Sequence, residues 1–160
     1  MAWSASAVFR EFLVGPCFQA SGTGWTGLDS DTVNVSLHNN SITPDKDAAV
    51  ASTGFNTGVW TTTNEVTDAT NWVSGGRALA SKTFTTPSSG VAMFDAADLA
   101  GGGNVTLASV FGCLVYDNTI TAGTVAKQGV CFNYFGGSQS VTAGTFTIVW
   151  SANGILRITV

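Results

Sequence analysis

The chain has 160 residues, of which 44% are hydrophobic and only 10% are charged, with a net charge of −4. The hydrophobic content excludes a disordered chain, and six scattered basic residues argue against nucleic-acid binding, which needs patches that follow phosphates. No apolar run reaches the roughly 18 residues of a membrane span, and no signal peptide is evident, so we expect synthesis in a cytoplasm.

Residues 1–14 are predicted to form an N-terminal helix. Phe9, Phe12 and Leu13 recur at helical spacing and would gather on one face. Gly15-Pro16 would then end the helix. Two roles are open for it: the helix closes one side of a β core, or its aromatic residues dock on a neighbouring subunit.

The middle of the chain predicts short strands and one more helix. Thr32–Asn39 alternates apolar and polar residues, which indicates a strand with one solvent-facing side, and His38 falls on that side. Thr43–Ser52 begins with Thr-Pro and acidic residues, which favours a small helix. Further strands are expected at Arg77–Thr85 and Val91–Asp95.

Residues 105–160 carry the clearest strand pattern of the chain. The predicted strands are Val105–Tyr116, Val130–Phe135, Thr145–Trp150 and Ile155–Val160. The last two alternate apolar and polar residues with a period of two, which a helix cannot produce. The Asn-Gly pair in Ser151–Gly154 suits a tight turn, so these two strands are predicted to form a terminal hairpin.

These segments together predict a single, mainly β domain over residues 1–160. Strands of five to eight residues, separated by Gly, Pro and Asn, are typical of an antiparallel β-sandwich or open barrel. The short N-terminal helix and one further small helix would pack on this β body.

No residue pattern predicts catalysis. His38 is the only histidine, and no serine lies in a GxSxG elbow that it could serve. The cysteines, Cys17, Cys113 and Cys131, form no CxxC motif, so no zinc site is predicted. Cys113 and Cys131 lie in predicted strands, where we expect them to be reduced and buried. We therefore predict no enzymatic activity and no cofactor.

The acidic residues do not predict a metal site either. The pairs Asp29/Asp31, Asp45/Asp47 and Asp95/Asp98 all fall at turns, where aspartate commonly bonds its own backbone. Two loops, one with Asp29 and Asp31 and one with Asp95, Asp98 and Asn104, are rich in oxygen ligands. Neither has the EF-hand arrangement, so calcium binding stays an open alternative rather than a prediction.

Aromatic residues placed among polar ones are the remaining candidates for function. Such residues either anchor the core or contact a partner. The candidates for an assembly interface are Trp3, Phe9, Phe12, Trp25, Trp60 and Trp72. A surface made polar by Thr, Ser and Asn rather than by charges can be buried against a neighbour at low cost, which fits a subunit of a large assembly and equally a secreted β-protein.

Several stretches also carry a likeness to a known group of proteins. They are Ala5–Phe12, Glu65–Trp72, Val110–Asn118, Phe132–Val141, Gly144–Trp150 and Ala152–Ile158. These stretches resemble small virion structural proteins of tailed bacteriophages, including phages of actinobacteria. The likeness is one of strands and turns rather than of an active-site motif, so it transfers no catalytic residue.

The resemblance implies a non-enzymatic virion component that is made in the cytoplasm of a bacterial host. Within the group we expect a capsid decoration (cement) protein, which sits on the outer shell, often as a trimer, and binds the major capsid protein. The alternative is a minor tail or tail-tip protein that contacts the host surface and stacks exposed tryptophans on glycans. A small β-sandwich hydrolase is a third class.

Overall fold

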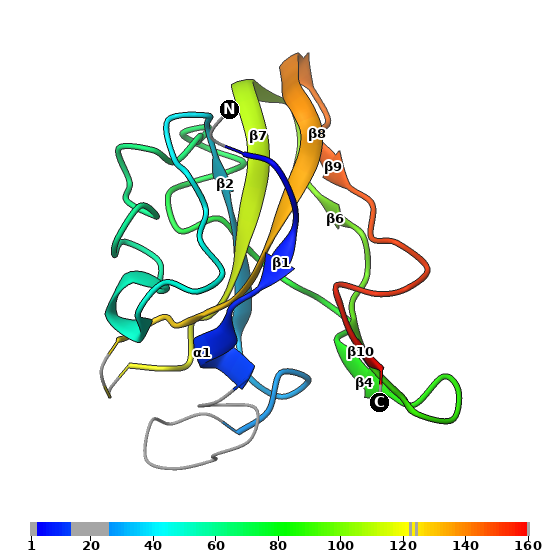
Figure 1. The fold of residues 1–160 in the computed structure, drawn as a ribbon. Coiled ribbons are helices and arrows are strands. Elements are labelled where there is room, and N and C mark those ends of the chain that lie inside the picture. The colour runs from blue at the N-terminus through cyan, green and yellow to red at the C-terminus, as the bar shows by residue number, and fades with distance from the viewer. Residues whose placement is uncertain (1–2, 14–25, 122, 124, 160) are drawn as a thin grey trace.

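A computed structural model describes residues 3–13, 26–121, 123 and 125–159. Within these ranges the chain is mainly β, and every strand pairing is antiparallel, which confirms the predicted fold class. A long pair of strands, β7 (Val105–Asp117) and β8 (Gly129–Gly144), runs through the middle of the molecule (Figure 1). The loop-rich segment that follows β2 (Val33–His38) lies on one side of this pair, and smaller sheets lie on the other side.

The main sheet has five strands in the order β1-β8-β7-β2-β3. They are β1 (Ala7–Val8), β8 (Gly129–Gly144), β7 (Val105–Asp117), β2 (Val33–His38) and β3 (Arg77–Ala78). The strands predicted at 32–39, 105–116 and 130–135 are thereby confirmed, and the last of them continues to Gly144. Register shifts between β7 and β8 mark bulges, which bend a strand pair and increase its twist.

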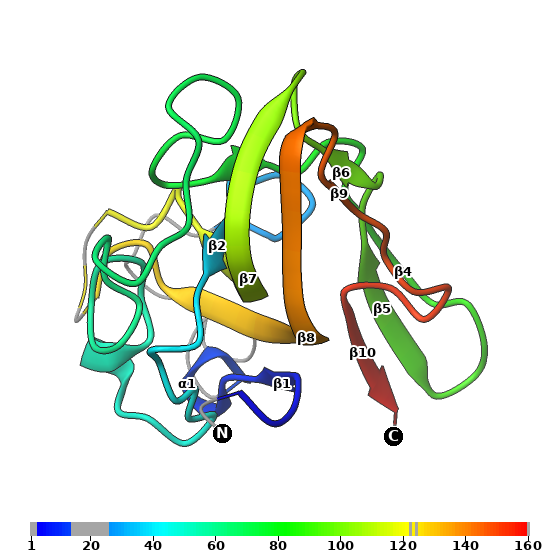
Figure 2. The same cartoon turned by 90° about the horizontal axis from the view of Figure 1, so that it is seen from above.

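Two smaller sheets complete the fold. The three-stranded sheet has the order β10-β5-β4 and contains β10 (Leu156–Thr159), β5 (Val91–Asp95) and β4 (Thr83–Thr85). The two-stranded sheet joins β6 (Leu99–Ala100) to β9 (Thr147–Ile148). Figure 2 shows the three-stranded sheet on the β8 side of the main sheet. The predicted strand at 91–95 is confirmed with the same bounds.

The predicted terminal hairpin is wrong. β9 pairs with β6, and β10 pairs with β5, so the two predicted partners belong to different sheets. The turn between them does exist, because the N–H of Gly154 donates to the carbonyl of Ser151 at 2.8 Å and Gly154 has a φ of 76°. The alternation identified strand segments, but the partners lie far away in the sequence and local pattern does not reveal them.

The predicted helix over residues 1–14 is also wrong. Ala7–Val8 form a strand on β8, and the helix α1 covers only Arg10–Phe12. Phe9 between them is extended, with φ −68° and ψ 130°, and its N–H donates to a carbonyl of β8 at 3.1 Å. An isolated helix of three turns is marginal in water, so backbone bonds to β8 and burial of the aromatic rings outweigh it.

The second predicted helix, Thr43–Ser52, shrinks to one 3₁₀ turn, η2 (Val50–Ser52). The side chain of Asp45 accepts the backbone N–H of Asp47 at 2.8 Å. This local bond forms a turn that competes with the first turn of a helix. The acidic residues that favoured a helix start therefore stabilise a loop.

The face of β2 predicted to meet solvent is buried. Ser36 and His38 have 0% exposure, as do Val35 and Leu37 on the other face. The segment that follows β2 folds back over this face (Figure 1) and places Trp60 edge-on to the His38 ring, with centroids 5.1 Å apart. Both faces of β2 therefore belong to the core. Its polar side chains either find hydrogen-bond partners inside the protein or remain without one.

Candidate functional site

Five of the six aromatic residues predicted as an assembly interface lie inside the chain. Trp3, Phe9, Phe12, Trp60 and Trp72 are at most 2% exposed. Trp25 lies outside the described residues. This burial leaves the five side chains no surface to offer another chain. We therefore correct their assignment from contact residues to core residues.

The aromatic rings of this core lock the N-terminal segment onto the main sheet. Trp3 meets Trp60 edge to face at 5.7 Å, and its Nε1–H donates to the carbonyl of Asn39 at 2.9 Å. Phe9 meets Trp60 at 6.0 Å and Phe132 of β8 at 5.3 Å. Aromatic pairs of this geometry each add about 0.5–1.5 kcal/mol beyond the burial of their area.

His38 does form a hydrogen bond with a serine, but solvent cannot reach the pair. Its Nε2 lies 3.0 Å from Ser36 Oγ, and both residues are fully buried. Burial lowers the pKa of His38 to about 4, so the imidazole is neutral at physiological pH. A catalytic nucleophile must reach a substrate, and this serine reaches only the protein interior.

A second polar group links a loop to β7. Glu65 accepts the Ser74 hydroxyl at 2.7 Å and the Gly75 N–H at 2.8 Å, and the Tyr116 hydroxyl donates to the Gly75 carbonyl at 2.7 Å. Burial raises the pKa of Glu65, against these hydrogen bonds and a nearby Lys127, and it raises the pKa of Tyr116 to about 12. Each oxygen of Glu65 is already bonded, so the group serves packing rather than chemistry.

The two loops considered for calcium do not assemble ligands. Among the described residues, no three His, Cys, Asp or Glu side chains gather into a metal-binding cluster. Asp31 points into the protein while Asp29 is exposed, and Asp98 accepts the backbone N–H of Trp150 at 3.0 Å. Asp31 instead lies against Asp117, a residue that the sequence analysis did not single out.

The cysteines in the strands agree with prediction. Cys113 and Cys131 are free and buried. Burial raises the pKa of both thiols, which keeps them protonated and unreactive. Cys17 lies outside the described residues.

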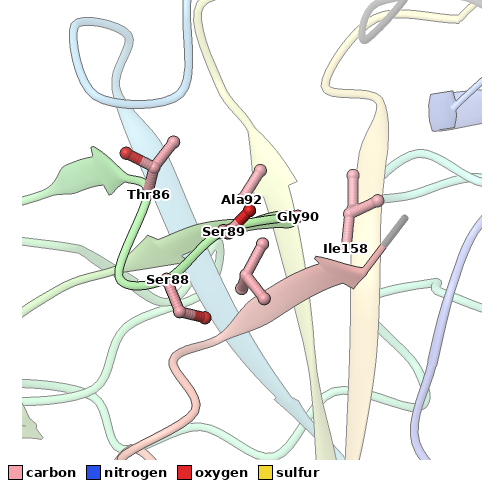
Figure 3. A pocket seen from close by; sticks show the side chains of 7 residues that line it. Thr86, Ser88, Ser89, Gly90, Ala92 and Ile158 are labelled. Carbon is pink, nitrogen blue, oxygen red and sulfur yellow. The ribbon is translucent and has the colours of Figure 1, made fainter.

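The three-stranded sheet carries an apolar hollow of about 490 Å³. Its lining residues are Thr86, Ser88, Ser89, Gly90, Val91, Ala92 and Ile158. The turn from β4 into β5 forms one wall and the end of β10 forms the other (Figure 3). Hydroxyl, methyl and backbone groups surround the hollow, and no ionisable side chain lines it.

The register of the three strands explains how this surface arises. Phe94 lies opposite Phe84 and Leu156, and Ala92 lies opposite Ile158, so all five side chains share one face. Phe94 and Leu156 are buried in the core, whereas Phe84 is 46% exposed and the Ala92 row is half-buried. Phe94 and Leu156 anchor the sheet, whereas the exposed Phe84 and the half-buried Ala92 and Ile158 extend past the core and together form an apolar ledge.

The sequence pattern predicts β5 but not this ledge. The alternation of Ala92 with Phe94 and of Leu156 with Ile158 was visible as strand pattern. The ledge depends on which strands pair, and on where the core stops covering their shared face. Only the three-dimensional arrangement contains that information.

No protein family, curated protein or solved structure matches the chain. None of the helices in the described ranges is long and apolar enough to cross a membrane.

Proposed function

We propose that the protein is a non-enzymatic capsid decoration protein of a tailed phage, which binds the major capsid protein through the apolar ledge of the three-stranded sheet. The observation that carries the proposal is the hollow on this ledge. Its lining offers methyl and hydroxyl groups but no acid, base or nucleophile with a base beside it. Such a surface suits binding of a protein rather than turnover of a substrate.

The surface chemistry supports attachment to a lattice. Hydroxyl and apolar groups can be desolvated without the cost of burying charge, and interface cores are depleted in charged residues. A shell presents the same binding site many times, so modest contacts suffice when copies act together. The resemblance of the sequence to virion proteins points in the same direction and favours a trimer as the working form.

The first test of this function is the copy number of the protein in purified virions, measured by quantitative mass spectrometry against the major capsid protein. A simple whole-number ratio to the capsid protein is expected. A few copies per particle would assign the protein to the tail or a vertex. Absence from the particles would contradict any virion role.

The ledge itself is tested with Phe84→Ser. Phe84 is 46% exposed, so the change should leave the fold intact while it removes apolar contact area at the ledge. We expect attachment to expanded capsids to weaken about tenfold or more, as truncation of an aromatic anchor typically does. Val73→Ser is the matched control, since Val73 is 48% exposed on a loop outside the ledge. Equal binding by both variants would contradict the ledge as the contact.

The tail-tip alternative has less support. It expects exposed tryptophans that stack on glycans, yet Trp3, Trp60 and Trp72 are buried and Trp150 is half-buried. Within the described part of the chain, no tryptophan is fully exposed. We therefore retain the capsid rather than the host surface as the proposed partner.

A further inference from the structure

Two carboxyl groups meet where β2, β7 and β8 come together. Asp31, just before β2, is 3% exposed, and Asp117, the last residue of β7, is 1% exposed. The backbone fixes this junction: Asn118 N–H donates to the Thr32 carbonyl at 2.8 Å, and Asp117 N–H donates to the Gln128 carbonyl at 2.9 Å. In the β2–β7 register Val33 lies opposite Asp117, so Asp31, two residues before Val33, lies at the same end of the sheet, and each carboxyl group affects the pKa of the other.

The hydrogen bonds around the two groups are unequal. Asp31 Oδ2 accepts the N–H groups of Thr26 at 2.8 Å and Gly27 at 3.1 Å, and its Oδ1 accepts the Thr26 hydroxyl at 2.5 Å. Asp117 Oδ1 accepts the N–H of Thr119 at 2.8 Å, but its Oδ2 is buried and has no partner. Three donors favour the ionised form of Asp31, whereas a buried carboxylate oxygen without a donor is costly.

We propose that the buried Asp117 carboxyl holds a proton and donates it to Asp31, so that the pair latches segment 26–31 to the end of the β7–β8 hairpin. The proton gives Asp117 Oδ2 the partner that it otherwise lacks. The pair then carries one negative charge instead of two. This latch is independent of the proposed function of the ledge, which lies on a different sheet.

No positive charge in the described surroundings takes the place of the proton. The charged group that acts on Asp117 is Asp31. Asp29 on the same segment is exposed and accepts the Ser30 hydroxyl, while Lys127 lies over the Phe55 ring at 5.4 Å and acts on Glu65. Burial, together with the like charge of Asp31, raises the pKa of Asp117 to about 7. Burial alone would raise the pKa of Asp31, but its hydrogen bonds from Thr26 and Gly27 lower it.

Loss of the shared proton turns the latch into a repelling pair. The unfolded chain releases the proton of Asp117 near its usual pKa of 3.8, and the folded chain releases it near 7. The folded state therefore loses stability as the pH rises through this interval and loses no more above it. The pKa of Asp31 is lowered in the folded state, so Asp31 affects stability only below its usual pKa of 3.8, where acid destabilises the folded state. Glu65 also has a raised pKa and adds to the loss of stability with rising pH. The effect of Asp117 is therefore measured as the difference between the wild type and Asp117→Asn.

The test compares unfolding of the wild-type protein and of Asp117→Asn as a function of pH. Between about pH 5 and pH 8 we expect the unfolding equilibrium constant of the wild type to rise roughly 100-fold more than that of Asp117→Asn, whose amide can donate to Asp31 without a titratable proton. Asp29→Asn, an exposed acid two residues from Asp31, is the control and should follow the wild type. Parallel profiles for Asp117→Asn and the wild type would overturn the proposal.

Carbon-13 NMR of the wild-type carboxyl groups gives a second, direct readout that needs no variant. We expect Asp117 to titrate near pH 7 and Asp31 to sense the same step, as coupled sites do. A midpoint for Asp117 below about pH 5 would overturn the proposal. Binding of a cation would also overturn the proposal. If millimolar CaCl₂ at pH 8 stabilises the wild type but not Asp117→Asn, the site holds a metal ion in place of the proton.

Discussion

Gly112 shows how a single residue admits a large side chain to the core. It lies in β7 opposite His38 of β2 and Tyr134 of β8, and the Trp3 ring rests directly on it. A Cβ at this position would lie 2.7 Å from Trp3 Cζ3, closer than real contacts allow. The absence of a side chain here is therefore what lets the N-terminal segment pack on the sheet.

Gly112→Ala is expected to lower the free energy of unfolding by about 1–3 kcal/mol, the usual cost of overpacking a core. Chemical denaturation of the single variant measures this cost. Because Asn133 of β8 is also close, part of the cost is independent of Trp3. The same substitution made together with Trp3→Leu should therefore cost less than it does alone, since contacting residues are coupled. An equal cost in both backgrounds would show that Trp3 is not the residue displaced.

At the scale of the elements, the main sheet and the three-stranded sheet differ in how completely they are covered. β2 and the adjoining half of β7 are buried on both faces. β10 has four residues, pairs only with β5 in the described structure, and shares its outer row with the half-exposed ledge. Segments with few buried contacts open at lower free energy than the core of the same protein.

We expect backbone amides of β5 and β10 to exchange with solvent through openings that cost about 2 kcal/mol less than those of β7 near Leu114. Native-state hydrogen exchange measures both. Gly154→Ala should widen the gap, because Gly154 has a φ of 76° and a Cβ there would lie 2.7 Å from Met93 Cγ in β5. Slower exchange in the small sheet than in the main sheet would contradict this division.

The same elements show how far the sequence could predict the structure. The strands at β2, β5 and β7 follow from local alternation or apolar runs, which depend only on near neighbours. The spacing of Phe9 and Phe12 satisfied a helix, but tertiary pairing of Ala7–Val8 with β8 overrode it. The ledge and the carboxyl pair join residues far apart in the chain, such as Asp31 and Asp117. The carboxyl groups of Asp31 and Asp117 meet only because β2 pairs with β7, and the ledge forms only because β5 pairs with β4 and β10. No local pattern reveals these pairings.

At the scale of the whole molecule, charge contributes little to cohesion. The ion pairs found in the described ranges join chain neighbours at the surface, Arg10 with Glu11 at 2.8 Å and Lys46 with Asp47 at 2.6 Å. Exposed pairs of this kind contribute little to stability, because water and salt screen them. The buried core and the hydrogen-bonded sheets therefore carry the stability, and the sparse surface charge leaves apolar and hydroxyl groups available for binding.

If the ledge attaches the protein to a capsid, this attachment should resist salt. The hollow has no ionisable lining residue, so screening removes nothing from the contact that the proposal invokes. Raising NaCl from about 0.05 M to about 0.5 M should change the affinity for expanded capsids by less than about threefold, because a contact without charge is insensitive to ionic strength. Co-sedimentation with capsids measures the affinity, and an unchanged unfolding midpoint at both salt concentrations serves as the control. A loss of about tenfold or more with an intact fold would show that charged residues outside the ledge make the attachment, since only charge–charge contacts weaken this steeply with salt.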